Sequence, residues 1–219
     1  MTTILATLFI GDLRPLPPEG QMSGIFKHPT RERIAVGTHG LEGDRQGDLR
    51  HHGGPDKAVH HYPAEHYAAF IQRWPQLAGI ALPGVLGENI SGTGLNESQV
   101  CIGDIYRIGS AVLQVSQPRT PCWKISHRLG VDKASQFVAE TGITGWYYRV
   151  LEPGSLAAGD TIERIARPNP ELTLASYWQA IHQHRPDPDL LERIAAAPGL
   201  AGDKAARHGE RARWLRQQG

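Results

Sequence analysis

Glycine and proline interrupt the apolar runs of this chain at short intervals, and this spacing limits the folds open to it. The 219 residues include 25 glycines and 16 prolines. Short apolar runs separated by turn residues are typical of β-strands and too short for a helical bundle. The segments predicted to be strands are residues 3–11, 33–40, 99–109, 110–117, 145–154 and 160–166.

Local signals add one hairpin and two helical regions. Gly109 and Ser110 separate two alternating runs, which predicts a tight β-hairpin. Residues 62–75 place apolar side chains at helical spacing, with Pro63 in the first turn. Residues 121–142 predict a short helix, a break at a glycine, and a second helix.

The composition changes after residue 165. A proline-rich stretch is followed by helical patterns over residues 172–184, 187–198 and 202–218, with no strand signal. We therefore expect an α+β chain: a β-rich domain at 1–166 and a small three-helix domain at 167–219. The extension is small enough that its own core is marginal, so we expect it to pack on the main domain or on a partner.

Charge and cysteine content exclude several classes of protein. Lys and Arg number 23 and Asp and Glu 22, so no strong overall field draws the chain to nucleic acid or a membrane. Two cysteines are too few for a disulfide framework. The first apolar run is too short to span a bilayer. We therefore expect a cytoplasmic protein that binds neither nucleic acid nor membrane stably.

Cys122 has two interpretations. Thr120 is a suitable helix cap and Pro121 suits the first helical position, which would put Cys122 in the first turn. The helix dipole and nearby cations, including Arg119 and Lys124, would then favour a thiolate that attacks electrophiles or binds a soft metal. The alternative is a small buried residue. The other cysteine, Cys101, lies in a strand pattern, and we expect it in the core.

A glycine-rich segment at 40–62 is the candidate anion site. Gly53 and Gly54 allow a backbone nest, and Lys57, Arg45 and His52 would add charge around a phosphate. The alternative is an exposed polar turn. The paired histidines at 51–52 and 60–61 lack the spacing of known zinc motifs, so a zinc site is not expected.

The stretch 87–98 contains Glu88 and Asn89, which can form directional hydrogen bonds to a heterocycle. Taken alone, this stretch is better explained as a polar turn.

Taken in order, these pieces resemble the MOSC domain family, the molybdenum cofactor sulfurase C-terminal type. The resemblance is carried by "GLEGDRQ", "HHGGPDKAVHHYPAEHY", "GENI", "IGDIYRIGSAVLQVSQPRTPCWKI" and "TGWYYRVLEPG". Within that family the chain resembles the YiiM-like group, which has a C-terminal three-helix extension. The resemblance implies a mixed β-barrel with peripheral helices and a molybdenum cofactor whose metal is ligated by Cys122.

The implied activity is reduction of N-hydroxylated compounds such as purines and amidoximes, which detoxifies base analogues. The resemblance implies that the pterin phosphate binds at the glycine-rich loop, with Arg119, Lys57 and His52 as candidate contacts. Asn89 is the candidate contact for the pterin ring. Glu88 or a histidine would move protons. The sequence has no flavin or nicotinamide fingerprint, so an external flavoprotein or similar carrier is expected to supply electrons.

Two other functions remain open at this point. Cys122 could carry a persulfide in a sulfur transferase, or the barrel could bind and deliver the cofactor without turnover. A homodimer through Trp178 and Trp214 of the extension is also an expectation.

Overall fold

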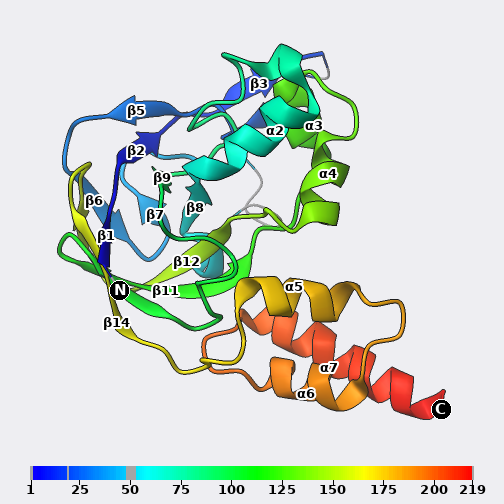
Figure 1. The fold of residues 1–219 in the computed structure, drawn as a ribbon. Helices are drawn as coiled ribbons and strands as arrows, with labels where there is room; N and C mark the ends of the chain where they lie inside the picture. Colours follow the sequence, from blue (N-terminus) through cyan, green and yellow to red (C-terminus); the bar gives the residue numbers. More distant parts are fainter. Residues whose placement is uncertain (1, 19, 48–52, 219) are drawn as a thin grey trace.

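The structure is a computed structural model that describes residues 2–18, 20–47 and 53–218 (Figure 1). Its main feature is a nine-stranded sheet with the order β1-β14-β10-β11-β12-β8-β9-β2-β5. In chain order the strands are β1 (Thr2–Ile4), β2 (Thr7–Ile10), β5 (His28–Thr30), β8 (Val59–Pro63), β9 (Ile90–Gly92), β10 (Ile105–Ile108), β11 (Ala111–Pro118), β12 (Trp146–Glu152) and β14 (Thr161–Ala166). Only the β8–β9 pair is parallel among these neighbours.

Two smaller sheets complete the strand content of the described residues. One has the order β13-β6-β7 and the other pairs β3 with β4. Their strands are β13 (Gly154–Leu156), β6 (Ile34–Gly37), β7 (Gly40–Leu41), β3 (Arg14–Leu16) and β4 (Gln21–Ser23).

The connection between β1 and β2 forces the large sheet to curl. β1 is at one edge and β2 is next to the other edge, yet only Leu5 and Ala6 separate them. Seven strand spacings of a flat sheet would put them roughly 34 Å apart, whereas this link reaches roughly 11 Å. Leu5 also continues the pairing of β1 with β14, donating its N–H to the Asp160 carbonyl at 2.9 Å. The predicted α+β class with a barrel-like sheet is therefore confirmed, as a curled half-barrel.

Three helices cover one end of this sheet (Figure 1). They are α2 (Tyr67–Arg73), α3 (Trp123–Leu129) and α4 (Ala134–Thr141). They share an apolar cluster that includes Phe70, Leu77 and Val138. The helix predicted over 62–75 is present but shorter, because Pro63 ends β8 and a 3₁₀ turn, η2 (Ala64–His66), precedes α2.

Most of the predicted strands are present, with corrections at residues 3–11, 33–40 and 99–104. The hairpin is present: Ile108 pairs with Ala111, and Gly109 has φ +56°. Residues 3–11 form two strands rather than one. Residues 99–104 are not a strand, because the Asp104 carboxylate accepts the Cys101 N–H at 3.0 Å and holds a turn. Cys101 is fully buried, as predicted.

Three helices follow the barrel, as the sequence patterns predict: α5 (Leu174–His182), α6 (Pro188–Ala195) and α7 (Gly202–Gln217). Leu174 and Tyr177 of α5 are buried in the same apolar cluster as the sheet. Trp178 is also buried, and its indole N–H donates to the Ala139 carbonyl at 2.9 Å. The dimer contact predicted for Trp178 is therefore wrong, because that ring packs inside its own chain. Trp214 is 57% exposed, and the homodimer stays a prediction.

None of the helices in the described ranges has the length and apolar character needed to cross a membrane.

A buried polar network joins four loops and strands at one end of the barrel. The Asp44 carboxylate forms an ion pair with Lys27, and both side chains are at most 5% exposed. It also accepts the Gly11 N–H and the Asn89 side-chain amide, both at 2.9 Å. Asn89 in turn accepts the His60 N–H at 3.0 Å. This network fixes the segments around β2, β5, β7 and β8 relative to one another.

Replacing Asp44 with Asn should leave Lys27 as an unpaired buried charge. We expect the free energy of unfolding to fall by about 3 kcal/mol, the usual penalty for breaking a buried pair. Adding Lys27→Met should recover part of this loss, because it removes the unpaired charge, while the new side-chain amide can accept from the Gly11 N–H but not also from the Asn89 amide. Urea denaturation of both variants tests this, and a double variant no more stable than Asp44→Asn would contradict it.

His61 makes the fold sensitive to acid. Its ring is buried against Trp146, with Nδ1 3.2 Å from the Tyr148 hydroxyl. Burial lowers the pKa of His61 to about 3. The unfolded chain therefore binds more protons below its usual pKa of about 6.5, and stability falls as the pH drops from there toward about 3.

The expected slope from His61 is at most about 1.4 kcal/mol per pH unit. His61→Phe should flatten the dependence of unfolding free energy on pH between about 6.5 and about 4, measured by urea denaturation. The exposed His39→Phe is the matched control. Equal slopes in both variants would show that His61 does not stay neutral in the fold.

Candidate functional site

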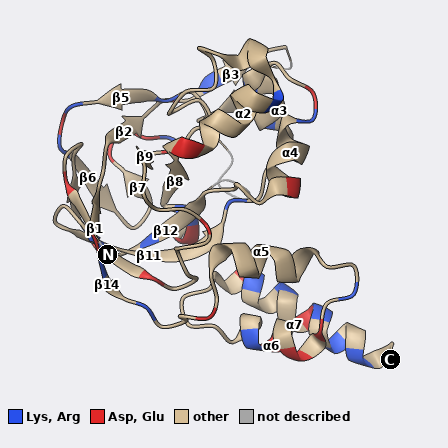
Figure 2. Cartoon of the chain, viewed as in Figure 1, with Lys and Arg blue, Asp and Glu red and all other residues tan. Residues whose placement is uncertain are grey.

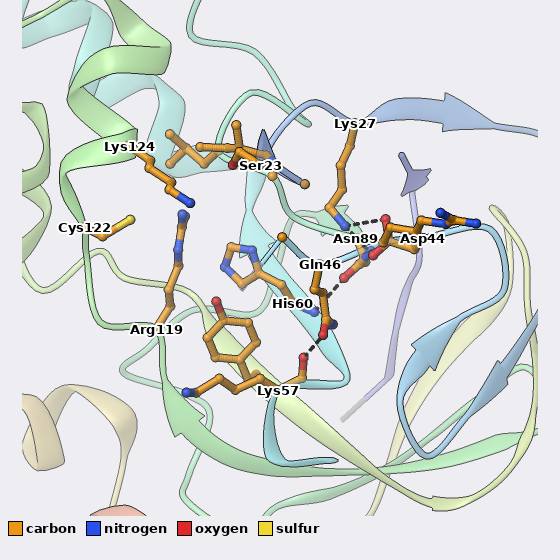
Figure 3. A pocket seen from close by; sticks show the side chains of 17 residues that line it. Ser23, Lys27, Asp44, Gln46, Lys57, His60, Asn89, Arg119, Cys122 and Lys124 are labelled. Carbon is orange, nitrogen blue, oxygen red and sulfur yellow. Dashed lines mark hydrogen bonds and ion pairs between the residues drawn. The ribbon is translucent and has the colours of Figure 1, made fainter. Parts of the chain in front are cut away.

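A pocket opens at the end of the barrel where β8, β11 and β12 meet the helical cover (Figure 3). It holds about 580 Å³ of free space, including its open mouth. The lining residues are Ser23, Gly24, Ile25, Lys27, Asp44, Arg45, Gln46, Gly47, Lys57, His60, Leu86, Gly87, Asn89, Arg119, Cys122, Lys124 and Tyr147. We call this the Cys122 pocket.

Strand pairing continues past the end of β11 and positions Arg119 and Cys122. The Arg119 N–H donates to the Gly145 carbonyl at 3.1 Å, so the chain stays extended there. Cys122 is then the residue before α3, with φ −130° and ψ 164°. The prediction that Thr120 caps a helix with Cys122 in its first turn is wrong, because the extended pairing delays the helix to Trp123.

Two cations of the pocket lack an acidic partner in the described part of the chain. Arg119 is 6% exposed and Lys124 is 5% exposed. Neither forms an ion pair with a described carboxylate, and Nη1 of Arg119 has no hydrogen-bond partner there. The Lys124 ammonium points toward the Arg119 guanidinium, with the Cys122 thiol beside them (Figure 3). Because buried charges are normally paired, this arrangement favours an anionic ligand.

Burial shifts the titration of three other lining groups. It lowers the pKa of Lys27, although Asp44 opposes that shift. It lowers the pKa of His60 well below the usual value, and the Arg119 charge acts in the same direction, so His60 is neutral. It raises the pKa of Tyr147. The wall therefore offers a neutral imidazole and a phenol beside fixed cations.

His60 is a lining group with unused hydrogen-bonding capacity. Its Nε2 finds no partner among the described residues. His61, the next residue of β8, faces the core instead, as expected for alternating side chains of a strand. Over the described ranges, no three His, Cys, Asp or Glu side chains come together as a metal site.

The structure brings together four of the predicted side chains. Lys57, Asn89, Arg119 and Cys122 all line the pocket. The Asn89 amide is already committed to Asp44, His60 and Phe9, so a ring contact would compete with these bonds.

Other predicted residues lie elsewhere. Gly53 and Gly54 precede the 3₁₀ turn η1 (Pro55–Lys57) and do not line the pocket. The Arg45 backbone reaches the pocket region, but its side chain is 72% exposed and 3.6 Å from Asp12. His52 lies outside the described residues.

Glu88 is buried behind the pocket wall. Its Oε1 accepts the Tyr67 hydroxyl at 2.6 Å and the Gly84 N–H at 2.5 Å. Its Oε2 has no partner among the described residues. Burial raises the pKa of Glu88. Its candidate role in proton movement therefore lacks a direct contact with the pocket.

Lys27, Asp44, His60 and Tyr147 were not predicted as cofactor residues. Lys27 is an isolated lysine outside every motif, and no local signal marks it. Asp44 lies within "GLEGDRQ", one of the pieces that carry the family resemblance, so that motif was the available signal. Because successive side chains of a strand point to opposite faces, a core position for Trp146 would have predicted that Tyr147 faces away from the core.

Comparisons with known proteins agree with this geometry. The chain is 40% identical to protein YiiM of Escherichia coli (strain K12) over 185 residues, which are 84% of this chain and 82% of that protein. The crystal structure of Escherichia coli YiiM superimposes with a TM-score of 0.81 and 31% identity, covering 97% of this chain and 92% of that one.

A third relative is a longer fungal protein. The "Reductase" of Gibberella moniliformis is 33% identical over 177 residues, which are 80% of this chain and 31% of that protein. A sequence profile of the MOSC domain matches residues 48–163, more than half of the chain. The chain therefore belongs to the MOSC domain family, as a YiiM-like member.

Proposed function

We propose that this chain is a molybdenum-cofactor-dependent reductase that converts N-hydroxylated compounds to the corresponding amines or amidines. The observation that carries the proposal is the partly exposed Cys122 thiol in one pocket with two buried cations, Arg119 and Lys124, that have no described acidic partner. MOSC domains are associated with molybdenum cofactor binding in general, and one relative is named a reductase.

The residues of the pocket fit the cofactor. A cysteine thiolate is a soft ligand suited to molybdenum. Arg119 has a buried N–H group without an acceptor among the described residues, and a phosphate would supply one. At Gly24 a Cβ would clash with the Arg45 carbonyl, so only glycine lets these two segments meet at the pocket wall.

When bound, the molybdenum–pterin group supplies the two-electron redox chemistry. The overall reaction is R–NH–OH + 2 e⁻ + 2 H⁺ → R–NH₂ + H₂O, so the N–O bond breaks and the oxygen leaves as water. Arg119 and Lys124 hold the anionic end of the cofactor. Neutral His60 accepts a hydrogen bond at Nε2, and the Tyr147 phenol can donate one to the substrate. An external flavoprotein supplies the electrons.

Cys122→Ala should remove the metal while the fold remains. We expect wild-type protein from a host that makes the cofactor to carry about one molybdenum and one pterin per chain. The variant should lose the metal and lose N-hydroxylamine reduction by at least about 100-fold, more than loss of an outer-shell group costs. Plasma mass spectrometry, pterin fluorescence and turnover measure this.

Cys101→Ala is the control, because that thiol is buried in the core. Full reduction by Cys122→Ala would remove this thiol from the metal. A folded wild-type protein without molybdenum or pterin from a competent host would overturn the proposed function. Cyanolysable sulfur on Cys122 in that preparation would favour sulfur transfer.

Lys124→Met should affect stability and binding in opposite directions. Removing a buried cation without a described acidic partner relieves repulsion with Arg119, so the cofactor-free protein should gain about 1 kcal/mol. The same variant should retain less pterin, because one phosphate partner is lost. Thermal unfolding of cofactor-free protein and pterin fluorescence test both effects, with the exposed Lys133→Met as control. A loss in both measurements would indicate that Lys124 is only structural.

A further inference from the structure

A second cavity lies between the end of β11 and the helices α5 and α7. Pro118 and Thr120 form its barrel side, Trp178 and His182 come from α5, and Lys204 and Arg207 come from α7. We call it the helix crevice. It holds about 860 Å³ of space, including its mouth. Lys and Arg are frequent along α7 (Figure 2).

The positive charge of the helix crevice is only partly neutralised by the described residues. None of the described residues that line it is acidic. Lys204 lies 3.9 Å from Asp203, which is largely exposed, and Arg207 forms no ion pair with a described residue. Arg211 donates to the Ile181 carbonyl at 2.6 Å, a neutral acceptor that leaves its charge in place.

Titration of the neighbouring groups agrees with this excess of charge. Burial lowers the pKa of His208 to about 4, and Lys204, Arg207 and Arg211 act in the same direction, while only Asp203 opposes them. Burial also lowers the pKa of Lys204, and both Lys57 and Arg207 add to that shift. A bound anion would oppose these shifts by offsetting the like charges.

The opposite wall of the helix crevice is aromatic. The rings of Trp178 and His182 lie with centroids 4.1 Å apart at an interplanar angle of 36°. The Tyr177 hydroxyl lies 2.7 Å from His208 Nε2, which fixes the imidazole beside the cations. The exposed His182 ring lines the crevice beside the cations, so it can contact a ring attached to the anionic group of a ligand.

The helix crevice is separated from the Cys122 pocket by one extended segment. Pro118 and Thr120 line the crevice, and Arg119 between them lines the pocket. This alternation follows from the period of two of an extended chain. The two cavities are therefore distinct sites that share one wall.

We propose that the helix crevice binds a small molecule through its phosphate or diphosphate group. A phosphate presents several acceptor oxygens to the Lys204 and Arg207 donors within a narrow space. Carboxylates of an acidic protein carry less charge per group, and the crevice is a recess rather than a broad surface. The phosphate source is a free anion or a nucleotide whose base packs on the exposed ring of His182.

Pyrophosphate binding to the cofactor-free protein tests the proposal. Calorimetry should resolve two sites, one in each cavity. Lys204→Ala with Arg207→Ala should weaken one site at least about tenfold, and Arg119→Ala with Lys124→Ala should weaken the other. Arg213→Ala on the same helix is the control, because it lies outside the helix crevice.

The His208 imidazole gives a local readout that the Cys122 pocket would not provide. NMR should show the pKa of His208 rising from about 4 when pyrophosphate binds to the wild type. In the Lys204→Ala, Arg207→Ala variant, adding pyrophosphate should leave the pKa of His208 unchanged. Tighter binding of ADP than of pyrophosphate would assign the nucleotide as the source, and equal binding would assign the phosphate group alone.

Three results would overturn the proposal. The crevice variant could bind pyrophosphate as the wild type does. The His208 resonances could be unaffected by a pyrophosphate concentration that saturates both sites. A polyglutamate peptide could bind in a way that depends on Lys204 and Arg207 while pyrophosphate does not, which would assign the cations to an acidic protein partner.

Discussion

The short link through Leu5 and Ala6 is the constraint on which the rest of the structure depends. It joins strands at opposite ends of the sheet order, so the sheet has to curl before β1 and β2 can both pair. The curl encloses the core. The neighbouring strands β11, β12 and β8 pair so that Pro118, Trp146 and His61 lie side by side, and this pairing places the pocket at their ends. The strand pairing that closes the sheet is non-local in sequence, which makes such folding slower than that of helical bundles.

Closure of the sheet does not by itself fix the positions of the loops at the rim. The Asp44 network holds these loops relative to one another. Asp44 satisfies a backbone N–H, an amide and an ammonium from three different segments. A buried carboxylate with this many donors is stable only when all of them are present, so its partners are fixed together. Asn89 extends the same network to the backbone of His60. The position of the neutral imidazole in the pocket thus depends on an ion pair on the neighbouring wall.

Much of the fold could be predicted from the sequence, because its strands, hairpin and C-terminal helices have local signals. Gly109 marks a turn by itself, and the helical pattern of residues 172–184 needs no tertiary contact to be visible. The helix boundary at Cys122 could not be predicted, since it depends on a hydrogen bond from Arg119 to Gly145, which lies far along the chain. Lys27 is a similar case: nothing near it in sequence indicates Asp44 as a partner. The site therefore was predictable where a motif is contiguous, as around Cys122, and not where separate loops converge.

The cations on the two sides of residues 118–120 interact electrostatically with one another. Arg119 and Lys124 face the Cys122 pocket, while Lys204 and Arg207 face the helix crevice, and no described acidic side chain lines the crevice. Lys57, which lines the pocket, already lowers the pKa of Lys204 on the other side. An anion in either cavity therefore reduces the repulsion felt in the other, and no change of shape is needed for this effect. Because charges beyond about 8 Å are screened at physiological ionic strength, the coupling is carried by the nearest pairs and weakens with salt. The near-neutral net charge of the chain does not reveal this local excess, since the Asp44 carboxylate of the pocket is already paired with Lys27.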